Sequence, residues 1–250
     1  MKNLDLPRVV AVVRRELLDY RRKRSIVVSM LIFPVLFLVE PVVAIFVAPP
    51  SGSTSSLDNA VILPLLYMLL MAVVTPSTLA AYSIVGEREQ GTLEPLLTTP
   101  LRQQEFVLGK AAAVMIPSVA LAYAVYALFL ICVALFAHRD VSAAVFHDGP
   151  TLLALFLFAP LVAGWAVVVG MGVSVRATEV RVAQQLGMLA SFPVIGVIVL
   201  LISGVIQPTF AAALEFGAGL LVADLLALRL VSRLFDRERL VTGSKASGRE

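Results

Sequence analysis

The sequence is poor in charge and nearly devoid of cysteine. Of its 250 residues, 15% are charged, against about 25% in soluble domains, while 59% are hydrophobic. Its single cysteine, Cys132, cannot form an internal disulfide bond. This composition excludes an ordinary water-soluble domain, a disordered chain and a small scaffold held together by disulfides.

Long uncharged runs are what the sequence does contain. Residues 59–86, 111–138, 149–175 and 182–214 form runs of 28, 28, 27 and 33 residues, and a helix needs about 20 apolar residues to cross a bilayer. The last run is long enough for two helices and breaks at Gln207-Pro208. A further apolar stretch begins at Ile26 and is interrupted by Glu40. Helices are expected because these runs lack the alternation of barrel strands.

We therefore predict an all-α polytopic membrane protein with a single domain at residues 1–250. Its six membrane helices are expected at residues 26–47, 61–85, 111–137, 152–175, 184–204 and 210–230. Nineteen of the 20 Lys and Arg residues fall on one side of this arrangement, and only Arg139 falls on the other. Because positive loops stay in the cytoplasm, both termini are predicted to be cytoplasmic, including the tail at residues 231–250. This topology explains the net charge of +3 without nucleic-acid binding, and it indicates a multi-pass protein of the cell (inner) membrane without a signal peptide.

Residues 1–25 are predicted to form a cytoplasmic amphipathic helix, because apolar residues recur on one stripe at helical spacing. The stripe contains Leu6, Val9, Val10, Val13, Leu17 and Tyr20. The opposite face contains Arg8, Arg15, Asp19 and Arg22. We interpret this helix as an anchor in the inner membrane interface, with a lever or docking role as the alternative.

The loop at residues 86–110, between the second and third predicted spans, reads GEREQGTLEPLLTTPLRQQEFVLGK. Gly91 permits a sharp turn, and Thr92 can cap a short helix that Thr99-Pro100 would end. A second helix is then expected to run through Phe106 into the third span. The short helix places four leucines on one face, namely Leu93, Leu96, Leu97 and Leu101. This face lies either on lipid or on a partner protein, because both would bury the same stripe.

Three acids lie within or near the predicted spans, where an unpaired charge is costly. Glu40 lies 14 residues after Ile26, which is about 21 Å along a helix. It either has a structural partner, reaches the outer edge of the bilayer, or lines a translocation path. Glu215 is expected near the outer end of the sixth span and Asp224 closer to its inner end. Glu40 and Asp224 are the candidate substrate-path residues.

The string GEREQGTLEPLLTTP, followed by LGK at residues 108–110, resembles the signature of permease subunits of ABC-2 type ATP-binding-cassette exporters. Weaker likeness is found in RRELLDYRRKR before the first span, VRVAQQLG before the fifth and LFDRERL after the sixth. The resemblance implies that the loop carries a coupling helix, which fits a groove of a separate ATPase subunit and transmits its closure to the spans. By resemblance, the coupling residues are Glu87, Arg88, Glu89, Gly91, Thr92, Leu93, Glu94, Leu96, Leu97 and Pro100.

The sequence lacks the loop G-x-x-x-x-G-K-[ST] that binds nucleotide phosphates, since Ala111 follows Gly109-Lys110 and Gln104 stands where the first glycine belongs. Neither catalytic residues nor a metal site nor a cofactor is expected in this chain, so ATP and magnesium would bind a partner. We expect two ATPase subunits, a second permease copy or paralogue, membrane lipid as the surroundings, and an exported substrate. The alternative is a proton-coupled secondary transporter that uses Glu40 and Asp224, for which an inverted repeat would be expected and is not found.

Overall fold

The computed structural model describes residues 5–22, 24–47, 64–65, 67–89, 91, 102–189, 192–203, 205 and 209–234, and every regular element among them is helical. The elements are α1 (Leu6–Arg22), α2 (Arg24–Val42), the π-helical turn η1 (Val43–Val47), α4 (Leu69–Glu89), α6 (Gln103–Phe136), α7 (Arg139–His147), α8 (Gly149–Arg176), α9 (Val180–Leu189), α10 (Phe192–Ile202) and α11 (Phe210–Leu234). The predicted all-α fold class is confirmed for this part of the chain.

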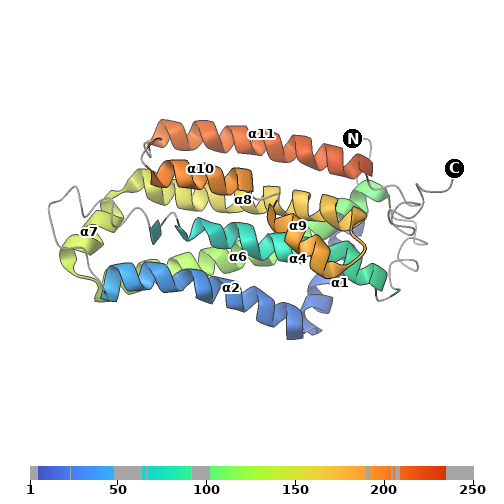
Figure 1. The fold of residues 1–250 in the computed structure, drawn as a ribbon, viewed down its shortest axis with the longest axis horizontal. Coiled ribbons are helices and arrows are strands. Elements are labelled where there is room, and N and C mark those ends of the chain that lie inside the picture. The colour runs from blue at the N-terminus through green and yellow to red at the C-terminus, as the bar shows by residue number, and fades with distance from the viewer. Residues whose placement is uncertain are drawn as a thin grey trace.

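The long helices α2, α4, α6, α8 and α11 run along one axis, with α1 at one end of the bundle and α7 at the other (Figure 1). We call these the α1 end and the α7 end. Helix α4 is largely buried, whereas α11 is mostly exposed. Buried side chains form one cluster that reaches Val145 of α7 and another that reaches Tyr20 of α1. The hydrophobic core therefore extends along the bundle from one end to the other.

Four helices are long and apolar enough to cross a membrane, at Leu69–Glu89, Gln104–Phe136, Gly149–Arg176 and Phe210–Ser232. They overlap the predicted second, third, fourth and sixth spans. The predicted first span overlaps the shorter apolar helix Met30–Phe46. The predicted fifth span, at residues 184–204, covers parts of α9 and α10, each of which is shorter than a membrane span. Residues 190 and 191, between these two helices, lie outside the described residues. The count of six spans and the cytoplasmic termini stay predictions.

Small residues allow α4, α8 and α9 to pack closely. A Cβ added at Gly170 of α8 would lie 2.9 Å from the Cβ of Ala80 and 3.1 Å from the carbonyl oxygen of Ser77, both on α4. A Cβ added at Gly187 of α9 would lie 3.3 Å from the Oγ of Ser77. Membrane helices are packed mainly by such close contacts, because lipid supplies no hydrophobic driving force between them. The register of α4 against α8 and α9 is therefore set sterically.

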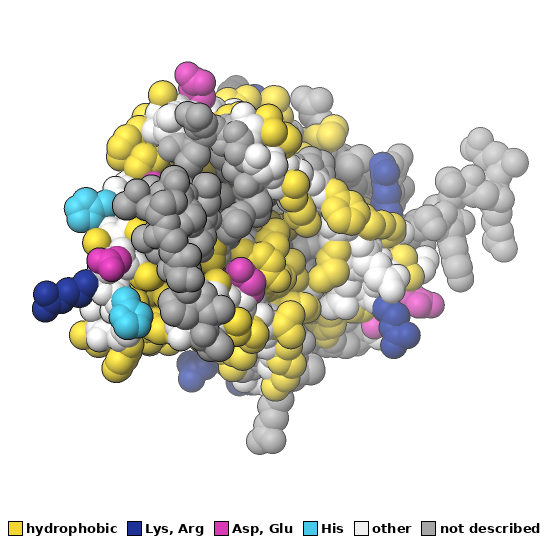
Figure 2. Space-filling view, turned by 60° about the vertical axis from the view of Figure 1, so that its left-hand side comes forward, with side chains coloured by type: hydrophobic (Ala, Val, Ile, Leu, Met, Phe, Trp, Pro, Cys, Tyr) yellow, Lys and Arg dark blue, Asp and Glu magenta, His cyan; other side chains and the backbone are white. Residues whose placement is uncertain are grey.

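The connection between the predicted third and fourth spans is helical and lies at the α7 end. The structure forms the nine-residue helix α7, whose Val141 and Val145 are one turn apart and buried in the core. Asp148 then caps α8, since its Oδ1 accepts a hydrogen bond from the Thr151 amide at 3.3 Å. Seen with this end turned forward, the described surface is largely hydrophobic, with scattered charged side chains (Figure 2). A short loop thus gains order by packing its two valines on the bundle.

Candidate functional site

The described parts of the predicted coupling loop meet at the α1 end. Helix α4 ends with Glu87, Arg88 and Glu89, and α6 begins at Gln103. Gly91 has a φ of 67°, which is the left-handed turn that its sequence position suggested. Helix α6 also runs through Phe106 into the membrane-capable segment, as predicted. The remaining predicted coupling residues lie outside the described residues, namely Thr92, Leu93, Glu94, Leu96, Leu97 and Pro100.

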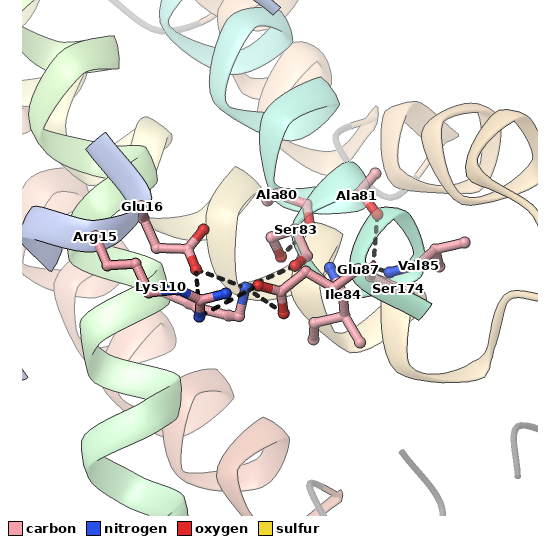
Figure 3. A network of polar contacts seen from close by, with 10 residues as sticks. All are labelled: Arg15, Glu16, Ala80, Ala81, Ser83, Ile84, Val85, Glu87, Lys110 and Ser174. Carbon is pink, nitrogen blue, oxygen red and sulfur yellow. Dashed lines mark hydrogen bonds and ion pairs between the residues drawn. The ribbon is translucent and has the colours of Figure 1, made fainter. Parts of the chain in front are cut away.

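Lys110 is fully buried where α1, α4 and α6 meet (Figure 3). Its Nζ lies 2.9 Å from Oε2 of Glu87 on α4 and 3.1 Å from Oε1 of Glu16 on α1. The same Nζ donates a hydrogen bond of 2.8 Å to the carbonyl oxygen of Ser83 on α4. It also lies 5.3 Å from the centre of the Phe106 ring. One lysine therefore joins three helices through two hydrogen bonds and an ion pair with Glu87.

Arg15 completes a cluster of four charges with Glu16, Glu87 and Lys110. Its Nη1 lies 3.8 Å from Oε1 of Glu87 and 4.0 Å from Oε1 of Glu16. Two cations therefore face two carboxylates, and the four-charge cluster has no net charge. A balanced arrangement is required here because an isolated buried charge would cost several kcal/mol. The cluster joins the end of α4 to the first turns of α6 and to the middle of α1.

Helix α1 is seated on α6 by a face that differs from the predicted stripe. Val12, Glu16 and Tyr20 are buried, whereas Leu6 and Val10 of the stripe are exposed. A helix was predicted within residues 1–25, with its hydrophobic stripe on the inner membrane interface. The structure forms the helix at Leu6–Arg22, and the contact of the stripe with the membrane stays a prediction. The packed face includes Glu16, whose Oε1 lies 3.1 Å from Nζ of Lys110. Burial, together with the nearby carboxylates, raises the pKa of Tyr20 above its usual range.

Gly109 brings α1 and α6 into contact beside the cluster. A Cβ added at this glycine would lie 2.7 Å from both Cβ and Cγ1 of Val12. At the start of α6, Glu105 accepts hydrogen bonds from the backbone amides of Arg102 at 3.0 Å and Asp5 at 3.2 Å. Arg8 of α1 lies 3.7 Å from the same Glu105 carboxylate. Helix α1 and the residue preceding it are thus attached to α6 at two levels.

Arg88 and Glu89 bind the junction between α8 and α9. The Nη1 of Arg88 donates to the carbonyl oxygen of Ala177 at 2.8 Å, and its Nη2 donates to that of Val175 at 3.1 Å. The Oε1 of Glu89 accepts from the amide of Val180 at 3.1 Å. Carbonyls at a helix C-terminus and amides at a helix N-terminus lack partners within the helix, so these side chains satisfy them. The end of α4 is thereby tied to both helices.

Ser174 of α8 holds α4 one turn before this point. Its hydroxyl accepts from the amides of Ile84 at 3.3 Å and Val85 at 3.1 Å, and it donates to the carbonyl oxygen of Ala81 (Figure 3). Ala81 and Val85 are the acceptor and donor of one α-helical hydrogen bond, so the serine side chain bridges both groups. A side chain placed at this point of a helix favours a bend. The sequence showed no signal for this contact.

The two candidate substrate-path acids lie on different helices and make no contact with each other. Glu40 is exposed on α2. Asp224 is partly buried on α11 against Gly164 of α8, where an added Cβ would lie 3.0 Å from its Oδ2. Its Oδ1 is buried without a hydrogen-bond partner among the described residues. In the described ranges, no three His, Cys, Asp or Glu side chains gather as a metal site would require.

These features define a polytopic helical membrane protein with a buried charge cluster at one end. A family model described as "ABC-2 family transporter protein" matches residues 10–228. The chain therefore belongs to the ABC-2 transporter family, as its sequence motifs indicated. Membership shows a multi-pass transport permease that is not itself a catalytic domain, and it implies association with ATPase subunits in general. A comparison with curated proteins gave no match.

Proposed function

We propose that the chain is the permease subunit of an ABC exporter, and that a separate ATPase moves it by pushing on residues 92–101. The observation that carries this proposal is the attachment of both ends of that segment. On one side, Glu87, Arg88 and Glu89 bind α6, α8 and α9. On the other side, Lys110 binds α1 and α4. A displacement of the segment would therefore reach five helices through short polar contacts.

Lys110 is unsuited to bind a nucleotide. It follows a glycine, as the lysine of a phosphate-binding loop does, but it has no exposed surface and its ammonium group already has three protein partners. The energy source is accordingly placed in partner subunits, two per transporter, which would hold ATP and magnesium. Closure of these subunits would favour one of two arrangements of the spans, and the nucleotide state would select between them.

The transporter is proposed to contain a second permease copy or paralogue and to export an amphipathic or polymeric substrate. Support comes from the family and from the exposed apolar sides of the long helices, which suit lipid or a second permease. Glu40 and Asp224 are retained as candidate residues on the substrate path. Their separation on α2 and α11 gives no support to a proton-coupled mechanism that requires both carboxylates at one site.

Site-specific photo-crosslinking tests the docking surface. A photo-reactive amino acid placed at Leu96 of the full chain in native membranes is expected to capture an ATP-hydrolysing protein. The matched control is Leu128 on α6, which is 58% exposed on an apolar helix and is expected to capture lipid. Capture of phospholipid alone at Leu96 would contradict the proposal. Proton-driven uptake by the purified chain without any ATPase would favour the secondary transporter instead.

A further inference from the structure

Helix α1 carries a buried glutamate that a simple membrane anchor does not need. An interfacial helix binds lipid with an apolar face and keeps its charges in water. Here Glu16 is 4% exposed and lies within the packed face, between Val12 and Tyr20. Its partner Lys110 lies 94 residues away in the sequence and is fully buried. The position of Glu16 therefore connects α1 to the coupling loop rather than to lipid.

The two ends of the coupling loop and α1 share one cation. Glu87 is on the last turn of α4, before residues 92–101, and Lys110 is on the second turn of α6, after them. Lys110 contacts Glu87 and Glu16 at 2.9 Å and 3.1 Å. A movement that separated α1 from α4 and α6 would break the buried ion pair between Glu16 and Lys110 and the 3.8 Å contact between Arg15 and Glu87, so the loss of both attractions opposes it. Helix α1 is thus constrained to follow the coupling loop.

Steric contacts act in the same direction. The close approach of Val12 to Gly109 prevents α1 from rolling over α6 without a clash. The amide of Asp5 and the side chain of Arg8 hold the beginning of α1 to Glu105 on α6. Asp5 and Glu16 are 11 residues apart, which corresponds to roughly 16 Å along a helix. Attachment at two separated points transmits rotation as well as translation.

We propose that α1 moves together with the two ends of the coupling loop, and that Lys110 is the positioning residue that makes α1 follow the loop. This inference rests on the proposed function, because it assumes that nucleotide moves the loop. It assigns α1 the lever role instead of the role of a static anchor. The four charges then have a purpose beyond stability, since they hold α1 at a fixed distance from both ends of the loop.

Distance measurements between spin labels test this assignment in the complex of the full chain with its co-purified ATPase. In a Cys132→Ala background, one label is placed at exposed Ala143 on α7 as the reference. The second label is placed either at Gln104 on the first turn of α6 or at Val10 on α1, both of which are exposed. Each distance is measured without nucleotide, with ADP, and with ATP and vanadate. We expect ATP and vanadate to change both distances.

Two charge-balanced double variants separate the lever from the anchor. R15Q/E16Q removes one cation and one carboxylate from α1 and leaves Lys110 paired with Glu87. We expect the nucleotide-dependent change at Gln104 to persist and the change at Val10 to fall to less than half. The matched control, R14Q/D19N, removes one charge of each sign from the same helix outside the cluster and should preserve both changes.

The outcomes distinguish this inference from the proposed function. If Gln104 moves in the unsubstituted complex but Val10 does not, α1 is a static anchor and the inference is wrong. It is equally wrong if R15Q/E16Q leaves the change at Val10 intact. If neither distance responds to nucleotide in the unsubstituted complex, the proposed coupling itself fails. The unsubstituted protein thus decides the question even if R15Q/E16Q does not fold.

Discussion

Replacement of Lys110 by methionine is the most direct perturbation of the four-charge cluster. Methionine retains a long unbranched side chain, so the substitution removes the charge and the hydrogen bonds with little change in volume. Within the cluster, the cation that remains for the carboxylates of Glu16 and Glu87 is Arg15, at 4.0 Å and 3.8 Å. The substitution also leaves the carbonyl oxygen of Ser83 without the hydrogen bond that Lys110 donates.

The expected cost follows from the distances and the burial. At the observed 2.9 Å and 3.1 Å, each ion pair of Lys110 has a Coulomb energy of roughly 5 to 6 kcal/mol at an effective dielectric constant of about 20. Most of this attraction offsets the cost of removing the charges from water. Loss of one member of a buried pair therefore leaves a net penalty of about 3–5 kcal/mol, since the remaining charge is uncompensated.

A second substitution should restore the balance of charge. In the double variant K110M/E87Q, Arg15 and Glu16 remain as one cation and one carboxylate. We expect this variant to regain at least about 2 kcal/mol relative to Lys110→Met, because an unpaired buried carboxylate is removed. This recovery is specific for charge, since the second substitution alone would be expected to destabilise an intact cluster.

The free energy of unfolding can be measured by steric trapping in detergent micelles, with helical content followed by circular dichroism. The surface control is Asp5→Asn, which removes an ion pair of 3.0 Å between side chains that are 44% and 43% exposed. It should cost less than about 1 kcal/mol. A loss of this small size for Lys110→Met, or a failure of Glu87→Gln to restore stability, would refute the reasoning about the cluster.

Three further substitutions test the close contacts near this cluster in the same unfolding assay. Gly109→Val should destabilise the chain by about 1–3 kcal/mol, because its Cβ would lie 2.7 Å from the side chain of Val12, and Val12→Ala should recover part of that loss. Gly170→Val should cost a similar amount, whereas Gly219→Ala, where an added Cβ meets no atom within 4 Å, should not destabilise; equal losses would contradict the steric argument. Ser174→Ala should lower the free energy of unfolding by about 1–3 kcal/mol, because its hydrogen bonds to α4 are lost. An unchanged stability would show that the backbone groups of α4 form their own helical hydrogen bonds at this point.

Elements with a local signal were predictable from the sequence. The spacing of apolar residues predicted a helix within residues 1–25, and the structure forms α1 at Leu6–Arg22. The uncharged runs at residues 59–86, 111–138 and 149–175 predicted spans that the structure forms as long apolar helices. Both signals depend on residues within a few turns of each other, so no knowledge of the tertiary contacts was needed. The left-handed turn at Gly91 was likewise suggested by a single residue type.

The packed face of α1 was not predictable in the same way. A hydrophobic stripe assigns charged residues to the solvent side, and this rule placed Leu6 and Val10 on the membrane interface and gave no signal that Glu16 would be buried. The structure instead buries Glu16, because a cation from α6 reaches it. In the sequence, Lys110 was noted only as the last residue of the LGK motif. That motif resembles ABC-2 permeases, and the resemblance implied a contact with the ATPase partner and not with α1. A buried charge is recognised when its partner is known, and the partner here is distant in sequence.

The contacts between α4 and α8 show a second limit. Gly170 and Ser174 are one turn apart on α8, and each faces the α4 backbone. Nothing in the local sequence distinguishes this glycine from others in the apolar helices, or this serine from one that faces lipid. Their roles depend on the register of two helices that are separated by residues 90–148.

The choice of charge at the α1 end is informative because charge is not the most stabilising solution. Buried ion pairs can often be replaced by hydrophobic residues of similar volume with no loss of stability. A methionine and two leucines could therefore hold α1, α4 and α6 together, but they would allow the helices to slide, since dispersion contacts have little directionality. Two cations and two carboxylates permit only registers in which every charge is paired. If α1 must keep its register while the coupling loop moves, as the lever role requires, this restriction is worth its electrostatic cost, and Lys110, which contacts all three helices, is where the restriction is imposed.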